Sequence, residues 1–194
     1  MDKGQISKWL AGAGVSVATA LAGGYLIIPH EGAVKDKEGM HVAYLDAVGI
    51  PTICYGQTGK DLYGRTIKLG MKLTEEECLE MLSKTLIKFE NQIDKYVKHK
   101  YASDYQKAML VSFTYNVGIG NLASSTLLRK LNAGDHVGVC DELSKWVYAK
   151  KKKLPGLVVR RKDEEQWCLG YVPKEASKTY SEMVLLTAAT TDKK

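Results

Sequence analysis

The sequence lacks the short motifs that usually mark a metal or redox site. Its four cysteines include no CxxC pair, and no HExxH or comparable ligand spacing is present. A zinc site and a thioredoxin-like site are therefore not expected. We predict that the protein binds no metal and no cofactor, and that His30 and His41 make local hydrogen bonds. The chain has no internal repeats either, which argues against a repeat architecture.

A strong charge bias is missing as well. The chain has 28 Lys and Arg against 22 Asp and Glu, a net charge of +6. This mild bias suits a polyanionic partner but selects none. The run Lys150–Lys153 has no alternating aromatic residues that could stack on bases. A solvated loop is therefore the favoured interpretation of this run, and no nucleic-acid partner is expected.

Charge is absent altogether from the apolar run Trp9–Ile28. A helix of this length could just cross a hydrocarbon core about 30 Å thick, and it shows no polar stripe. Lys3 and Lys8 precede it, which predicts an N-terminus inside the cell and the rest of the chain outside. More than half of the run is Gly, Ala, Ser or Thr, so the segment would be held only weakly in a bilayer. We expect an uncleaved anchor that can leave the membrane.

Cleavage is the alternative for this segment. Ala20-Leu21-Ala22 resembles a signal-peptidase site. The apolar run continues to Ile28, beyond that site, which favours the uncleaved form. In an exported chain, Cys54, Cys78, Cys140 and Cys168 predict two disulfides, for which three pairings are possible. Four free thiols in a cytosolic protein remain the alternative.

The remaining pattern predicts an α+β fold. Residues 29–73 are rich in Gly, β-branched and aromatic residues, with turns at 37–39 and 56–59, and predict a small sheet. Further on, capping signals and apolar periodicity predict a long helix from Thr74 and others over about 103–118, 125–131, 135–148 and 157–169. We therefore expect four parts: an apolar N-terminal helix (1–28), a β-rich lobe (29–73), an interlobe helix with a larger helical lobe (74–171), and a loose polar tail (172–194).

Three polar residues stand out as candidates for chemistry. Glu31 follows the apolar segment, Asp46 precedes a glycine turn, and Thr52 lies six residues after Asp46. A hairpin would bring Asp46 and Thr52 side by side, where a carboxylate and a hydroxyl could hold one water. Two carboxyl groups across a cleft are what hydrolysis of a glycosidic bond requires.

The stretches around these residues resemble the phage lysozymes (glycoside hydrolase family 24). The resemblance covers about residues 29–171, in the expected order, and its N-terminal segment resembles that of signal-anchor-release endolysins. It is carried by His30-Glu31-Gly32, Ala43–Asp46, Gly49–Gly56, Thr74–Leu82, Ser112–Gly118, Ser125–Leu128 and Gly156-Leu157 with Arg160-Arg161.

The resemblance implies roles for the three residues. Glu31 would be the general acid, Asp46 the carboxylate that positions water, and Thr52 its hydroxyl partner, with inversion at the sugar carbon. Fourteen residues separate Glu31 from Asp46, more than is usual in the family, and Glu38 is a second candidate with seven between. We prefer Glu31, because Glu38 lies in a predicted hairpin tip where water would keep it ionised.

The implied function is an endolysin muramidase that hydrolyses the β-1,4 bond between N-acetylmuramic acid and N-acetylglucosamine in peptidoglycan, for host lysis and phage release. The enzyme would be tethered to the outer face of the host inner membrane through residues 9–28, then free in the periplasm, as a monomer. The alternative is a membrane-tethered, non-catalytic wall-binding protein. We also expect the pairs Cys54–Cys78 and Cys140–Cys168, which would tie the β-rich lobe to the long helix and join two C-terminal helices.

Overall fold

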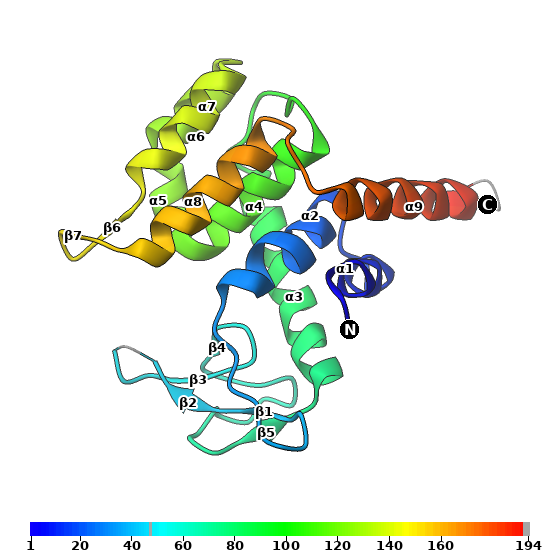
Figure 1. Ribbon diagram of the computed structural model, residues 1–194, viewed down its shortest axis with the longest axis vertical. Helices are drawn as coiled ribbons and strands as arrows, with labels where there is room; N and C mark the ends of the chain where they lie inside the picture. The colour runs from blue at the N-terminus through cyan, green and yellow to red at the C-terminus, as the bar shows by residue number, and fades with distance from the viewer. Residues whose placement is uncertain (47, 192–194) are drawn as a thin grey trace.

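The computed structural model describes residues 1–46 and 48–191, and it has the predicted α+β architecture. A small lobe of short strands lies at one end of the molecule and a larger helical lobe at the other, with α3 running between them (Figure 1). The helices are α1 (Lys3–Gly12), α2 (Val17–Leu21), the π-helix η1 (Ala22–Ile27), the 3₁₀ helix η2 (Ile28–His30), α3 (Glu75–Ile93), α4 (Asp104–Val117), α5 (Ile119–Ala123), α6 (Thr126–Asn132), α7 (His136–Glu142), the 3₁₀ helix η3 (Leu143–Lys145), α8 (Pro155–Cys168) and α9 (Lys174–Thr191). The strands are β1 (His41–Val42), β2 (Tyr44–Leu45), β3 (Pro51–Ile53), β4 (Gln57–Thr58), β5 (Lys72–Leu73), β6 (Tyr148–Ala149) and β7 (Lys152–Lys153).

The predicted single apolar helix at the N-terminus is not confirmed, because the segment consists of the separate helices α1, α2 and η1. α1 ends at Gly12, the chain turns through Gly14 at φ +88°, and Ser16 caps the new helix α2. Within the described residues, no helix is both long enough and apolar enough to span a bilayer. Gly14 allows this left-handed turn because glycine has no side chain. The turn separates α1 and α2, which pack on each other.

This segment is part of the core of the helical lobe. Leu10, Leu21, Leu26 and Ile27 are fully buried or nearly so, and α2 and η1 pack against α4. The small residues permit close approach. A Cβ added at Gly23 would lie 2.4 Å from Leu10 Cδ1, and one at Gly24 would lie 2.5 Å from the backbone oxygen of Lys3. The glycines that make the segment a weak membrane anchor thus let α1 lie directly against η1.

The β-rich lobe consists of two small antiparallel sheets, ordered β1-β5 and β2-β3-β4. The expected turn at 37–39 is present, but the second turn lies at Cys54–Gly56, and Gln57 and Thr58 form strand β4. Cys54 and Gly56 both have positive φ, which allows the chain to reverse there.

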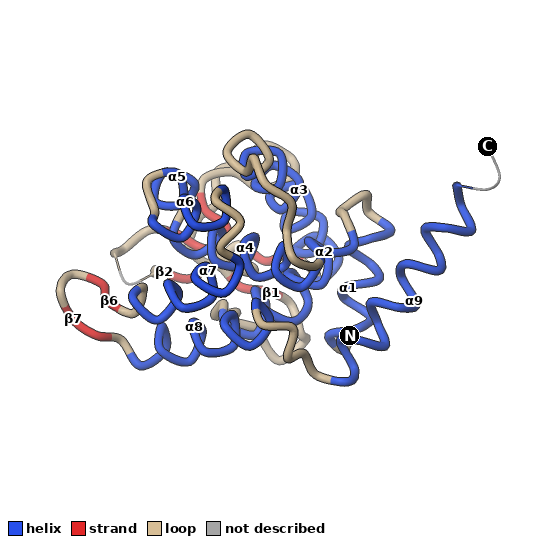
Figure 2. The backbone as a smooth tube through the Cα atoms, turned by 90° about the horizontal axis from the view of Figure 1, so that it is seen from above, coloured by secondary structure: helices blue, strands red, loops and turns tan. Residues whose placement is uncertain are grey.

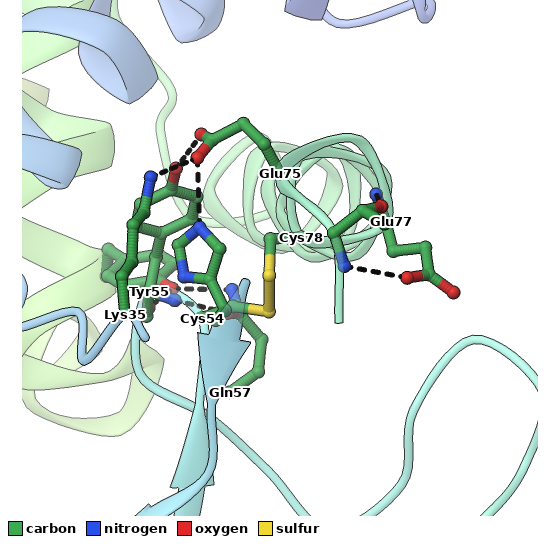
Figure 3. Close-up of a disulfide and its surroundings, with 10 residues drawn as sticks. Lys35, Cys54, Tyr55, Gln57, Glu75, Glu77 and Cys78 are labelled. Atoms are coloured by element: carbon green, nitrogen blue, oxygen red, sulfur yellow. Dashed lines mark hydrogen bonds and ion pairs between the residues drawn. A yellow bond between two sulfur atoms is a disulfide. The ribbon is translucent and has the colours of Figure 1, made fainter. Parts of the chain in front are cut away.

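The β-rich lobe is attached to the first turn of α3. Thr74 and Glu77 form the predicted capping box, and the predicted Cys54–Cys78 disulfide is confirmed, with α-carbons 5.3 Å apart. Beside it, Glu75 accepts hydrogen bonds from Lys35 and Tyr55, and lies 3.0 Å from His41 Nε2 (Figure 3). Covalent and polar contacts therefore fix the same end of the helix.

The helical lobe follows the predicted boundaries closely in α4, α6 and α8. Ser103 caps α4, Gly118 ends it, and the predicted Cys140–Cys168 disulfide joins α7 to α8. The helix predicted over 135–148 is shorter than expected. It ends at Glu142 and gives way to η3 and then strand β6, which pairs with β7. Lys150–Lys153 thus form a hairpin.

Most of the expected loose tail is instead the helix α9, which extends along α1 and projects beyond the helical lobe (Figures 1 and 2). Residues 192–194 of the predicted tail lie outside the described residues. Ala176 and Met183 are buried against the body of the protein. Tyr25 and Thr179 share a buried hydrogen bond of 3.0 Å, and Lys8 pairs with Glu182. Residues of the polar tail form an ordered helix because α1, which packs as part of the globular domain, gives them a surface to pack against.

The Glu75 cluster predicts a pH-dependent stability. Burial raises the pKa of Glu75, but hydrogen bonds from Lys35, Tyr55 and His41 outweigh it and lower the pKa to about 2, from an ordinary 4.5. A carboxyl with a depressed pKa stabilises the fold above its unfolded pKa, and this contribution disappears as the pH falls toward its folded pKa. We expect Glu75→Gln to lower the free energy of unfolding at pH 7 by at most about 3 kcal/mol, and by little at pH 2.

Urea unfolding at several pH values checks this, with Glu76→Gln as the matched control. Glu76 is the exposed neighbour of Glu75 on the same helical turn. A loss for Glu75→Gln that is equal at pH 7 and pH 2 would show that the ionised carboxylate contributes nothing.

Candidate active site

Glu31 lies where the buried N-terminal segment meets the β-rich lobe. Its backbone N–H donates to Ile27 O at 3.0 Å, which continues the last turn of the segment. Its side chain is 20 % exposed, and Arg160 Nη1 donates to its Oε1 at 2.7 Å. Of the two adjacent arginines, Arg160 is thus the one that contacts the acidic residue. The Glu31 carboxyl has one oxygen held by the helical lobe.

Arg160 is itself fixed by buried partners. Its Nε lies 3.3 Å from Glu164 Oε1, and its Nη2 donates to Ser112 O at 3.3 Å. Ser112 Oγ donates to Glu164 at 2.7 Å, and Arg161 Nε lies 3.0 Å from the other Glu164 oxygen. Two guanidinium groups and two carboxyl groups therefore form one nearly dry network. Such networks persist only when nearly every charge is paired.

The second oxygen of Glu31 faces the turn before β4. A Cβ added at Gly56, where φ is +85°, would lie 3.2 Å from Glu31 Oε2. That oxygen has no hydrogen-bond partner among the residues the structure describes. Glycine therefore leaves room beside Oε2 for another group.

Tyr115, on α4, holds this turn in place. Its hydroxyl donates to Tyr55 O at 2.6 Å and accepts from Gln57 Nε2 at 3.0 Å. The backbone N–H of Tyr55 donates to Gln57 Oε1 at 2.9 Å. The position of Gly56 against Glu31 is thus set by a residue of the opposite lobe.

The hairpin of β2 and β3 brings Asp46 and Thr52 close, but not in direct register. Thr52 pairs with Tyr44, and the backbone N–H of Asp46 donates to Ile50 O. Thr52 is buried, and its hydroxyl donates to Ile50 O at 3.1 Å. The hydrogen bond with Ile50 N–H lowers the pKa of Asp46 most, followed by that with Val48 N–H, while the nearby Thr52 hydroxyl contributes less.

Asp46 belongs to a loop motif that occurs three times in this lobe. Asp36, Asp46 and Asp61 each accept backbone N–H bonds from the second and fourth residues that follow. Asp36 also pairs with Lys72, and Asp61 with Arg65. Asp46 has no ion-pair partner among the described residues. Its charge is therefore the one of the three that no cation neutralises.

Tyr44 connects the two halves of the candidate site. Its hydroxyl donates to Gly32 O at 3.2 Å, and its pKa is raised by burial and by the carboxylates of Glu31 and Asp46. Residues two apart in a strand share a face, and so do residues directly opposite in an antiparallel pair. Tyr44, Asp46 and Thr52 therefore face the same side. Sequence reasoning missed Tyr44, although its position two residues before Asp46 was a signal.

The other residues singled out in the sequence lie elsewhere. Glu38 is exposed at the tip of the hairpin before β1. His30 Nε2 lies 3.0 Å from Asp163. Asn116 accepts from Arg161 Nη2 at 2.9 Å, which is a structural contact within the buried network. Among the described residues, the one group with metal-ligand composition is His41 with Cys54 and Cys78, whose sulfurs are joined in the disulfide.

The chain resembles known phage proteins over most of its length. The family model for phage lysozyme matches residues 35–164, a stretch that begins after Glu31. SAR-endolysins of Bacteriophage PS119 and Enterobacteria phage P21 are 43% and 41% identical to it over 160 residues, which is 79% of this chain and 92% and 93% of theirs. These relatives are endolysins, which favours an enzyme over the non-catalytic alternative.

Solved structures agree with this assignment. The endolysin from Escherichia coli O157:H7 phage FAHEc1 is 34% identical, with a TM-score of 0.65 over 77% of this chain and 92% of that one. The active form of P1 phage endolysin Lyz, at 22% identity, shares the fold with a TM-score of 0.71 over 90% and 97% of the two chains. The chain therefore belongs to the phage lysozyme family and is a glycoside hydrolase, an endolysin muramidase that acts on peptidoglycan in host lysis.

Proposed function

We propose that Glu31 is the general acid of this muramidase, and that Asp46 and Thr52 hold the attacking water, with inversion at the sugar carbon. The observation that carries the proposal is the arrangement around Tyr44, whose hydroxyl donates to Gly32 O, next to Glu31, at 3.2 Å, and which pairs with Thr52 in the hairpin that leads to Asp46. Two carboxyl groups facing a common space from separate elements are what an inverting glycosidase needs.

The two carboxyl groups are suited to different tasks. Arg160 holds Glu31 Oε1, and Oε2 beside Gly56 is left to meet the glycosidic oxygen. Asp46 has a lowered pKa and no cationic partner among the described residues, so it stays ionised and can accept a hydrogen bond from water. The Thr52 hydroxyl lies near it and can bind the same water. Asp46 thus has the surroundings of an anionic water holder, and in this proposal Glu31 is left as the proton donor.

The first prediction tests the choice of acid. Glu31→Gln should abolish turnover, because an amide cannot donate the proton, and should leave the fold intact. Glu38→Gln is the control, and it should retain the parental rate because Glu38 is exposed at a hairpin tip. The assay is release of reducing ends from purified peptidoglycan, with thermal unfolding measured in parallel. An active Glu31→Gln together with an inactive Glu38→Gln would make Glu38 the acid.

The second prediction tests the water holders. Asp46→Asn keeps an oxygen that can accept the loop N–H groups but removes the charge, so the rate should fall by about 10² to 10⁴. Thr52→Ala should also lower the rate. Asp36→Asn is the matched control, since it changes the same loop motif and should leave the rate nearly unchanged. Equal losses for Asp46→Asn and Asp36→Asn would mean that only loop structure matters.

We also propose that residues 9–28 hold the enzyme at the outer face of the inner membrane before it is released to the periplasm. The proposal is supported by the uncharged run and by relatives described as SAR-endolysins. If the run spans a bilayer, Glu31 lies three residues from its end, a reach of about 10 Å at most. The Glu31–Arg160 contact requires the segment to be packed in the helical lobe. The tethered enzyme should therefore be inactive.

The packed structure also bears on the cleavage alternative. Cleavage after Ala22 would remove Leu10 and Leu21, both fully buried in the core. Loss of two such side chains costs several kcal/mol. An enzyme that keeps the segment retains this core, which supports release without cleavage.

The third prediction tests release. Gly12→Leu and Gly23→Leu add the same apolar surface to the segment, but only Gly23→Leu would clash with Leu10 in the packed form. We expect Gly23→Leu to stay in the membrane fraction after a depolarising agent, without lytic activity, and Gly12→Leu to be released more slowly than the parent. Fractionation with a lytic assay and the mass of the released N-terminus measure this. Release of both variants at the parental rate, or a mass that shows loss of residues 1–22, would contradict the proposal.

A further inference from the structure

The β-rich lobe makes few polar contacts with the rest of the protein. Four of its side chains bind carboxylates in the first turn of α3, and these are Lys35, His41, Tyr55 and Tyr63. Beyond that turn, the side-chain hydrogen bonds between residues 32–46 and 48–73 and residues 78–191 all involve Tyr115. The hydroxyl of Tyr115 therefore provides the polar link between this lobe and α4.

The Tyr115 hydroxyl both donates and accepts a hydrogen bond at this link. It donates to Tyr55 O at 2.6 Å and accepts from Gln57 Nε2 at 3.0 Å. Tyr55 and Gln57 are buried, whereas Gly56 between them is exposed. Burial, and then the charge of the Glu31 carboxylate, raise the pKa of Tyr115, so the hydroxyl keeps the proton that it donates. The link thus holds both neighbours of Gly56 and leaves Gly56 itself open to solvent.

Gly56 is the residue of this turn that borders the proposed acid. A Cβ at Gly56 would lie 3.2 Å from Glu31 Oε2, so a small shift of the turn would change the space beside that oxygen. The other oxygen is already bound to Arg160. A general acid must lie within hydrogen-bond reach of the atom that it protonates, and a misplacement of about 1 Å can cost about 10²-fold in rate. The position of the turn therefore bears directly on proton transfer.

We propose that Tyr115 is a positioning residue of the reaction. Its hydroxyl clamps the Cys54–Gly56 turn at the distance from Glu31 at which the glycosidic oxygen fits beside Oε2. This proposal rests on the proposed role of Glu31 as the general acid. Tyr115 acts through Gly56 and does not touch the substrate in this role. Its ring packs on Phe89, with ring centroids 5.7 Å apart, so a phenylalanine at position 115 can keep this packing and lose both hydrogen bonds.

Tyr115→Phe in the full chain tests the clamp. With purified peptidoglycan over a range of concentrations, kcat should fall by about 10-fold to 100-fold, because the acid loses its placement, and KM should hardly change. Amide hydrogens of residues 54–58 should exchange faster with deuterium, because the turn is no longer held. Tyr180→Phe is the matched control. It removes one hydroxyl hydrogen bond, from α9 to Asp104 on α4, and should keep the parental kcat.

Gln57→Met tests the other side of the same link. It removes the hydrogen bond to Tyr115 and nearly keeps the length of the side chain. Its kcat should fall less than that of Tyr115→Phe, because Tyr115 still donates to Tyr55 O. The double variant should be hardly slower than Tyr115→Phe alone, since both changes break one link. Losses that multiply would show independent effects and would overturn the clamp.

Two further outcomes would overturn the clamp. One is a parental kcat for Tyr115→Phe. The other is a loss of kcat that disappears when the assay temperature is lowered, which would show that the hydroxyl contributes to stability alone. Glu31→Gln, measured beside these variants, separates the two proposals. If Glu31→Gln is inactive and Tyr115→Phe is fully active, the clamp fails and the acid stands. If Glu31→Gln is active, the choice of acid fails and the clamp fails with it.

Discussion

Burial of residues 18–27 in the helical lobe determines where the candidate active site forms. α2 and η1 pack against α4, and the chain leaves them at Glu31. Glu31 therefore reaches Arg160 because the preceding residues are fixed, and its own backbone N–H donates to Ile27 O. The small side chains of the segment make this packing close. The same composition that lowers its affinity for lipid provides its fit to protein.

Electrostatic contacts then orient the two carboxyl groups of the candidate site. Arg160 is shared between Glu31 and the buried Glu164, whose other oxygen faces Arg161. The buried Glu164 carboxylate holds the Arg160 guanidinium in place, and the Arg161 guanidinium balances the remaining negative charge of the network. On the opposite lobe, the backbone N–H groups of Val48 and Ile50 hold Asp46. One carboxyl group is thus oriented by side-chain charges and the other by a loop.

Local signals in the sequence predicted much of the fold. The capping box of Thr74 and Glu77, the start of α4 after Ser103 and its end at Gly118, and both disulfides are all as expected. These features depend on neighbouring residues or on the order of elements. The site residues Glu31, Asp46 and Thr52 were chosen from short motifs, and the structure places them around Tyr44, while their roles stay predictions.

The features that the sequence did not reveal depend on distant partners. An uncharged run such as Trp9–Ile28 has the same hydropathy whether lipid or protein surrounds it, so the break after Gly12 could not be foreseen. The order of α9 depends on α1, which lies at the opposite end of the chain. Helical periodicity separates Arg160 from Arg161 by about 100°, but does not say which of them faces Glu31.

The order of the two disulfides along the chain has a consequence for oxidative maturation. Each cysteine pairs with its nearest neighbour in sequence, at separations of 24 and 28 residues, so the two covalent rings neither overlap nor enclose each other. Either ring can close first without threading the chain through the other. A mispaired bond between Cys78 and Cys140 would instead close a much larger loop, which is entropically costlier to form. Proximity along the chain therefore favours the native pairing even before the two lobes meet.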